Sequence, residues 1–299
     1  MIDLPILTRF ASEAVRARFP LDAIWHPGNI VWELLVEATT GAFDQPHAMR
    51  IWTSADEAVA VAWFVGLRKI HLECLPDHDN LVPEMLAWAE GVARAEGYDR
   101  LSVLVMDRDI QRASMLGVSG YRSDELQSVV FRNDLDSLAA HASPPDGAVA
   151  LDCRDVDAEA RAACHRDAWN DLSNIGIEDA HSTFSADVYR SLRGEPAYDT
   201  SLDLVIQAST GAFVSNCICW ADDGSGIGLF EPVGTSSRFR GRGFGRAVVS
   251  EGLRRLQSRG MRWARVSTAH FNAPAIATYK SCGFNVVDQT RWWTKDLVE

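Results

Sequence analysis

The stretch Arg240-Gly241-Arg242-Gly243-Phe244-Gly245-Arg246 decides how this chain is interpreted. It follows an apolar run typical of a strand, 228–235, and leads into a helical pattern over 245–258. The first N–H groups of a helix have no partner inside the helix, and the helix dipole adds partial positive charge there. Glycines let such amides approach an anion, and arginines add charge-assisted hydrogen bonds. The stretch therefore predicts a phosphate site at a helix start.

Three kinds of phosphate loop can be compared with this stretch. The nucleoside-triphosphate loop ends in Lys followed by Ser or Thr, and that pair is missing here. The dinucleotide pattern G-x-G-x-x-G/A fails, because the sixth position is Arg246 when counted from Gly241. The pyrophosphate loop R/Q-x-x-G-x-G/A is matched by Arg240, Gly243 and Gly245.

A second motif lies downstream and reads Asn272-Ala-Pro-Ala275-Ile-Ala-Thr-Tyr279-Lys-Ser-Cys-Gly283-Phe284. Its Asn, its Ala three residues on, its Tyr seven residues on and its closing Gly-Phe stand in the same order as in the GNAT superfamily of N-acyltransferases. With the two motifs together, residues 148–299 resemble that superfamily. The resemblance implies a twisted mixed sheet flanked by helices, in which two central strands splay apart to admit the pantetheine arm of coenzyme A.

The resemblance also assigns residues to acetyl-CoA, which would be the co-substrate, and it implies no metal. Backbone groups at Val233, Gly234 and Thr235 would contact the acyl carbonyl and the pantetheine. Pro232 and Gly234 suit such a place, because proline cannot donate to a sheet and glycine permits close approach. The remaining predicted cofactor-binding residues are Arg240, Gly241, Arg242, Gly243, Phe244, Gly245, Arg246 and Asn272.

Amine attack on a thioester needs a base for the amine, a donor for the oxyanion and a proton for the leaving sulfur. The resemblance makes Tyr279 the candidate acid at the sulfur and the N–H of Val233 the oxyanion donor. Glu231, on the strand that enters the site, is the candidate base. Strict alternation would place Glu231 and Val233 on one face, although Pro232 disturbs that alternation.

Each assignment has a structural alternative. Tyr279 could be a core aromatic, and Glu231 could orient the substrate or simply lie at the surface. Asn272 is also a good helix N-cap, with Pro274 in the first turn. Cys282 could form an acyl intermediate, but we interpret it as a packing residue.

The chain divides into two similar halves. The sequence His-Ala-Ser-Pro-Pro-Asp-Gly at 141–147 predicts a linker between domains at 1–140 and 148–299. Gly97 and Gly120 have the same spacing as Gly260 and Gly283. The fold class is therefore α/β (α+β), with two tandem GNAT-like domains, each a mixed twisted sheet flanked by helices, an architecture similar to that of the mycothiol synthases.

The first half lacks the second half's motifs. In the repeat register Tyr279 falls on Leu116, and the glycine loop falls near Pro76-Asp77-His78-Asp79-Asn80. That segment has no glycine, and its carboxylates would repel a pyrophosphate. We therefore predict a degenerate domain at 1–140, which supports the fold or forms one wall of the acceptor pocket, and a catalytic domain at 148–299.

Composition narrows the partners. The net charge of −12 argues against nucleic acid, yet residues 236–262 hold eight arginines and one acid. No apolar run approaches the roughly 20 residues that a membrane helix needs. The N-terminus shows no signal-peptide pattern, and the six scattered cysteines suit reduced, buried thiols. These features predict a cytoplasmic monomer or homodimer.

The sequence thus predicts an acetyl-CoA-dependent N-acetyltransferase. Its acceptor would be a primary amine, a small molecule rather than a protein, which attacks the thioester directly. A non-catalytic sensor that binds acyl-CoA is the alternative from another class. Tyr279 favours the enzyme, because a sensor needs no acid at the sulfur.

Overall fold

The computed structural model describes residues 4–37, 49–138, 142–145, 147–178 and 180–298, so the predicted linker 141–147 lies partly outside the described residues. The strands are β1 (Met49–Ser54), β2 (Glu57–Gly66), β3 (Lys69–Cys74), β4 (Arg100–Met106), β5 (Arg122–Asp134), β6 (Val149–Asp152), β7 (Asp203–Gln207), β8 (Phe213–Asp222), β9 (Ile227–Thr235), β10 (Trp263–Ala269) and β11 (Asn285–Asp296). The α-helices are α1 (Leu4–Arg18), α2 (Pro27–Trp32), α3 (Val82–Ala95), α4 (Ile110–Val118), α5 (Ala158–Trp169), α6 (Ala186–Arg193), α7 (Phe244–Ser258) and α8 (Ala273–Ser281).

All described strands belong to one mixed sheet, in the order β1-β2-β3-β4-β11-β5-β10-β9-β8-β7-β6. The fold class and the tandem arrangement are as predicted. The strand order also shows an exchange that the sequence did not reveal. The last strand of each half pairs with a strand of the other half. β11 pairs with β4 through contacts such as Trp292 with Leu104, and β5 pairs with β10 through contacts such as Phe131 with Val266.

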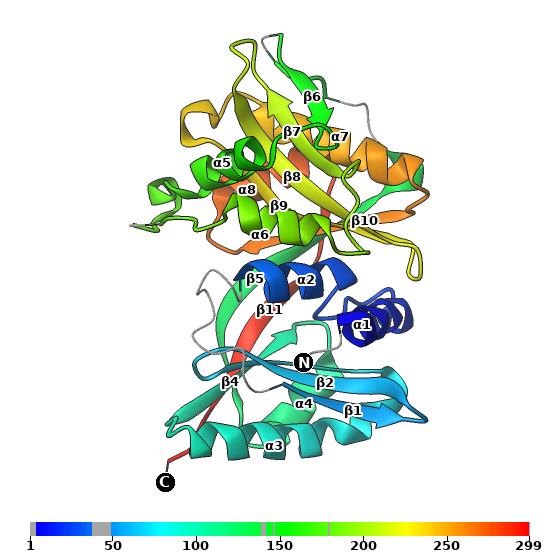
Figure 1. Ribbon diagram of the computed structural model, residues 1–299. Coiled ribbons are helices and arrows are strands. Elements are labelled where there is room, and N and C mark those ends of the chain that lie inside the picture. Colours follow the sequence, from blue (N-terminus) through cyan, green and yellow to red (C-terminus); the bar gives the residue numbers. More distant parts are fainter. Residues whose placement is uncertain (1–3, 38–48, 139–141, 146, 179, 299) are drawn as a thin grey trace.

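The exchanged strands β5 and β11 also pair with each other and cross the middle of the molecule (Figure 1). Separating the halves would therefore break backbone ladders as well as side-chain contacts. The exchange also carries Phe131 of β5 into the second half's core, with its ring centroid 5.7 Å from that of Tyr279. A residue of the first half thus supports the predicted catalytic tyrosine.

Side chains of β8 alternate between two cores, because successive residues of a strand point to opposite faces. Cys217 and Cys219 pack with α7 and α8, whereas Ile218 and Trp220 pack with α5 and α6. The second half is therefore a sheet covered on both faces by helices. Among the described residues, none of the helices is long and apolar enough to span a bilayer.

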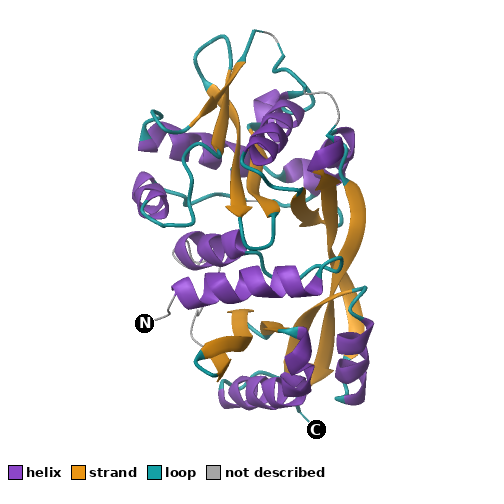
Figure 2. Ribbon diagram, turned by 90° about the vertical axis from the view of Figure 1, so that its right-hand side faces the viewer, coloured by secondary structure: helices purple, strands orange, loops and turns teal. Residues whose placement is uncertain are grey.

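Helices α1 and α2 lie between the two halves, and Figure 2 shows α1 running across the molecule between their strands. The short helix α2 packs in both directions, with Ile30 in a core of the first half and Trp32 against helices of the second. His26 caps α2: its Nδ1 accepts a hydrogen bond from the Gly28 N–H at 3.0 Å. Its Nε2 lies 3.0 Å from the carbonyl oxygen of Ile227 on β9.

This histidine leads to a prediction about acid stability. Burial lowers the pKa of His26 from 6.5 to about 4, although the Ile227 carbonyl and the charges of Asp222 and Asp22 act in the opposite direction. The unfolded chain therefore binds the proton more readily between these values, and stability falls as the pH drops from 6.5 towards 4, by up to about 1.4 kcal/mol per pH unit for one group. Urea unfolding at several pH values should show a shallower decline for His26→Gln than for the wild type. An identical decline in both proteins would contradict this assignment.

Candidate active site

The site begins where two neighbouring parallel strands separate. β9 and β10 pair only from Ile227 with Trp263 to Leu229 with Arg265. Beyond that point β10 continues to pair with β5, and β9 with β8. This opening is the splay that the sequence resemblance implied. It borders a pocket of about 620 Å³ lined by Ala168, Trp169, Leu172, Asn174, Ile175, Val233, Gly234, Thr235, Arg240, Gly241, Gly243, Gly245, Arg246, Asn272, Pro274, Ala275, Ala277, Thr278, Tyr279 and Ser281.

The glycine turn at the start of α7 has the backbone shape that its sequence predicts. Gly241 and Gly243 have φ values of 70° and 89°, a region that side chains disfavour. The Gly243 carbonyl accepts the first helical hydrogen bond, from the Ala247 N–H. Phe244 is 1% exposed and anchors the helix start in the core. Within the described chain no side chain caps this end, so its first N–H groups are available to an anion at the pocket wall.

Gly245 brings the helix start close to the end of β9. A Cβ at Gly245 would lie 3.1 Å from the hydroxyl oxygen of Thr235, tighter than ordinary contact. That hydroxyl in turn lies 2.9 Å from the Ser215 hydroxyl, which donates to the Gly234 carbonyl at 2.9 Å. Because Gly245 has no side chain, the turn and the end of β9 can pack closely against each other along one side of the pocket.

The arginines of the turn differ in what they contact. The Arg240 guanidinium donates to the carbonyls of Thr235 and Ala168 and to the side chain of Asn174, at 2.6–3.1 Å. It therefore clamps the turn to β9 and to the end of α5. Arg242 lies over the rings of Phe239 and Phe244, with its guanidinium carbon 5.3 and 5.5 Å from their centroids. Arg246 is exposed and lines the pocket.

β9 is irregular where it enters the pocket. Phe230 pairs with Cys219 and Val233 pairs with Cys217, so Glu231 and Pro232 form a bulge opposite Ile218. After this bulge Val233 and Gly234 line the pocket, whereas Glu231 does not. The disturbance of alternation expected at Pro232 is thus present.

Gly234 is required by an aromatic neighbour that the sequence did not single out. A Cβ there would lie 2.1 Å from the ring of Trp169, which lines the pocket at the end of α5. Trp169 stacks on the buried His165, with centroids 4.1 Å apart and planes 12° from parallel. Burial lowers the pKa of His165, so this ring stays neutral in its stack near neutral pH. Trp169 and His165 therefore form a rigid apolar wall.

The predicted acid lines the pocket, whereas the predicted base does not. Tyr279 lines the pocket and is 5% exposed, with its ring against Phe131 and Phe284. Burial raises the pKa of Tyr279, and the negative charge of Glu231 raises it further. The phenol therefore keeps its proton over the physiological range, as an acid must. Glu231 is half-buried, and Asn29 of α2 donates to its carboxylate at 3.4 Å.

Asn272 has the structural role that the sequence suggested. Its side chain accepts a hydrogen bond from the Ala275 N–H at 3.2 Å and caps α8. Both residues line the pocket, so the cap also fixes the pocket wall. The predicted contact of Asn272 with pantetheine stays a prediction.

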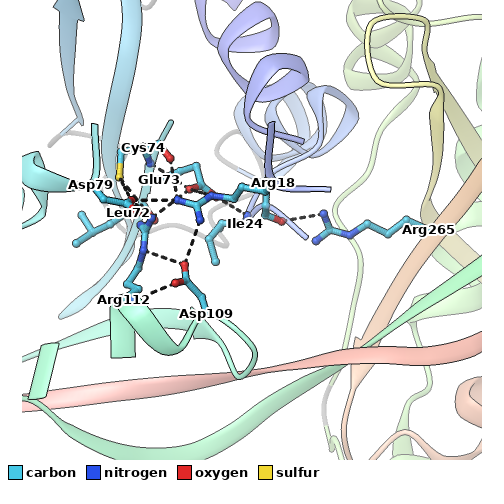
Figure 3. Close-up of polar contacts among 10 residues, drawn as sticks. Arg18, Ile24, Leu72, Glu73, Cys74, Asp79, Asp109, Arg112 and Arg265 are labelled. Carbon is cyan, nitrogen blue, oxygen red and sulfur yellow. Dashed lines mark hydrogen bonds and ion pairs between the residues drawn. The ribbon is translucent and has the colours of Figure 1, made fainter. Parts of the chain in front are cut away.

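At the matching place in the first half, buried charged side chains contact the strand. β3 and β4 pair in parallel only as far as His71 with Leu104, which repeats the opening of the second half. Beyond it, Arg112 donates to the Leu72 carbonyl at 2.8 Å and Arg18 donates to the Cys74 carbonyl at 2.8 Å. Figure 3 shows both guanidinium groups pointing toward this part of β3.

Three carboxylates surround these two arginines. Glu73 accepts from Arg18 at 2.9 Å and from Arg112 at 3.4 Å, and Asp109 lies 3.3 Å from Arg18. Asp79, from the segment that replaces the glycine loop, lies 3.4 Å from Arg18. Both guanidinium groups are nearly fully buried. Arg265, labelled in the same view, donates to the Ala23 carbonyl and ties β10 to the segment between α1 and α2.

Comparison with known proteins identifies a similar family for most of the second half. The profile of the Acetyltransferase (GNAT) family matches residues 169–284, which contain the splayed strands, the glycine turn and Tyr279. The segment that holds these features is therefore similar to that family.

One curated relative is similar to a shorter part of the chain. Over 83 residues the chain is 32% identical to a mycothiol acetyltransferase of Thermobifida fusca, a match that covers 26% of this chain and 24% of that protein. The chain thus spans about a quarter of the length of the curated relative.

Two solved structures match almost the whole chain. A GCN5-related N-acetyltransferase from Sphaerobacter thermophilus matches 99% of this chain and 93% of its own, with 19% identity and a TM-score of 0.60. A tandem GNAT protein from the clavulanic acid biosynthesis pathway matches 98% of this chain and 95% of its own, with 16% identity and a TM-score of 0.62. The chain therefore shares its overall fold with these two proteins.

Proposed function

We propose that this protein is an acetyl-CoA-dependent N-acetyltransferase that acetylates a primary amine of a small molecule. One observation carries the proposal: a single pocket joins the open helix start at Gly243–Gly245 to a buried, protonated Tyr279 beside the splayed strands. The pyrophosphate and the thioester lie at opposite ends of the pantetheine arm of acetyl-CoA, and this pocket offers complementary groups to both.

Each proton transfer and hydrogen bond of the reaction is then assigned to a group of this chain. Acetyl-CoA supplies the activated acyl group, and the amine attacks its carbonyl carbon. Glu231 accepts the proton that the amine must lose, directly or through water. The N–H of Val233 donates to the developing oxyanion, and the Tyr279 hydroxyl donates its proton to the departing sulfur. Burial and the negative charge of Glu231 raise the pKa of Tyr279, which supports its role as a protonated acid.

The alternative is an acyl-CoA sensor, and a thiol-release assay separates it from the enzyme. Coenzyme A release is measured with acetyl-CoA and a panel of primary amines. The proposed enzyme releases thiol with at least one amine, in proportion to acetylated product. Tight binding of acetyl-CoA without release for any amine would support the sensor instead.

We also propose that each chain has one cofactor site, in residues 148–299, and that residues 1–140 are a degenerate domain. The arginines and carboxylates around Glu73 fill the place that corresponds to the pantetheine contacts of β9. Calorimetric titration with acetyl-CoA should therefore give one binding event per chain. Two binding sites per chain, or binding that persists after the glycine turn of the second half is disrupted, would contradict this prediction.

A further inference from the structure

We infer that the first turn of α2, which belongs to the first half, is a working part of the catalytic site. Asn29 is the positioning residue for the Glu231 carboxylate, and His26 and Gly28 fix the turn that presents it. The inference rests on the proposed function, because it assigns Glu231 the role of base. It gives residues 1–140 a role in the reaction, although charged side chains occupy the place in the first half that corresponds to the pocket.

The orientation of the Asn29 amide follows from its two contacts. Its Oδ1 accepts a hydrogen bond from the His26 backbone N–H at 2.9 Å. The NH₂ group must therefore point the other way, and it donates to Oε2 of Glu231 at 3.4 Å. A donor to an ionised carboxylate favours the charged form, which is the form that a base needs.

His26 holds this turn against the strand that carries Glu231. Its ring is fully buried, and Nδ1 accepts from the Gly28 N–H, so Nε2 carries the proton. Nε2 accordingly donates to the Ile227 carbonyl at 3.0 Å, at the start of β9 and four residues before Glu231. The first turn of α2 is thereby fixed to β9 at Ile227 and, through Asn29, at Glu231.

Gly28 adds a third point of support. A Cβ at this position would lie 2.3 Å from the indole ring of Trp220, so helix and ring are in direct contact. The Trp220 Nε1 donates to the backbone carbonyl of Glu231 at 2.7 Å. The turn therefore steadies the backbone of Glu231 through Trp220 and its carboxylate through Asn29.

The test compares Asn29→Asp with Glu231→Gln in the thiol-release assay, using the amine with the highest turnover. Asn29→Asp keeps the oxygen that accepts from the His26 N–H, so the capping contact and fold are retained, but it removes the donor and adds a like charge. We expect kcat to fall about 10- to 100-fold while the KM for acetyl-CoA is unchanged. Asn80→Asp, the same change at an exposed position of the first half, should have no effect.

A double variant shows whether Asn29 acts through Glu231. In a Glu231→Gln background, Asn29→Asp should cause little further loss, because residues that act together are not additive. An equal loss in both backgrounds, or full activity of Asn29→Asp beside an impaired Glu231→Gln, would overturn the positioning role and leave the proposed function intact. Full activity of Glu231→Gln would instead overturn its role as base, and the inference with it.

Discussion

Replacing Gly243 with valine is expected to remove acetyl-CoA binding. The residue has a φ of 89° immediately before α7, and its neighbours Gly241 and Gly245 line the same pocket. A β-branched side chain would disfavour this backbone shape and occupy the space beside the amides. Losing two charge-assisted hydrogen bonds at roughly 1.5–3 kcal/mol each weakens binding more than about 100-fold. Calorimetry with acetyl-CoA measures the change directly.

A control variant separates the backbone strain of the Gly243→Val substitution from its effect on binding. Gly97 has a φ of 74° after a helix of the first half and has no atom within 4 Å of an added Cβ. Gly97→Val carries a similar backbone cost, on the order of 1–3 kcal/mol, far from the turn. Both variants should lose thermal stability, but only Gly243→Val should lose affinity. Unchanged affinity in Gly243→Val would show that the cofactor binds elsewhere.

The second large effect is expected from Tyr279→Phe. Removing the hydroxyl leaves the ring packing on Phe131 and Phe284 but takes the proton donor from the sulfur. General acid catalysis contributes typically 10²- to 10⁴-fold, so kcat should fall at least about 100-fold. Affinity for acetyl-CoA should remain, because the turn at α7 is untouched. Steady-state kinetics beside calorimetry separates the two quantities.

The raised pKa of Tyr279 also predicts how activity depends on pH. Burial and the Glu231 charge raise the pKa of Tyr279, and a phenol is an acid only below its pKa. Activity of the wild type should therefore show no loss from tyrosine ionisation until the pH exceeds 10, the ordinary value for tyrosine. A Tyr279→Phe enzyme with wild-type kcat would make the residue a core aromatic, the structural alternative.

Local signals in the sequence were sufficient for the elements that carry the site. The helical pattern predicted over 245–258 is α7 with one added residue. Glycine spacing and N-cap chemistry depend on a few adjacent residues, so they can be interpreted without tertiary structure. The glycine turn and the Asn272 cap are consequently found where the sequence put them.

Long-range pairing could not be predicted in the same way. β5 and β11 both alternate in ways that suit a strand, and neither pattern specifies its neighbour. The exchange of these strands therefore appeared only in the structure. The contact of Asn29 with Glu231 joins residues 202 positions apart, and a lone asparagine at the start of a short helix gives no sign of it. No local pattern marked Trp169 as part of the pocket lining either.

The central claim is that backbone amides around residues 241–246 hold a pyrophosphate at the start of α7. A crystal structure of the protein with acetyl-CoA tests it most directly. We predict the pyrophosphate against the Gly243–Gly245 turn, the pantetheine between β9 and β10, and the thioester sulfur beside the Tyr279 hydroxyl. Cofactor bound elsewhere, with the turn empty at saturating acetyl-CoA, would contradict the account.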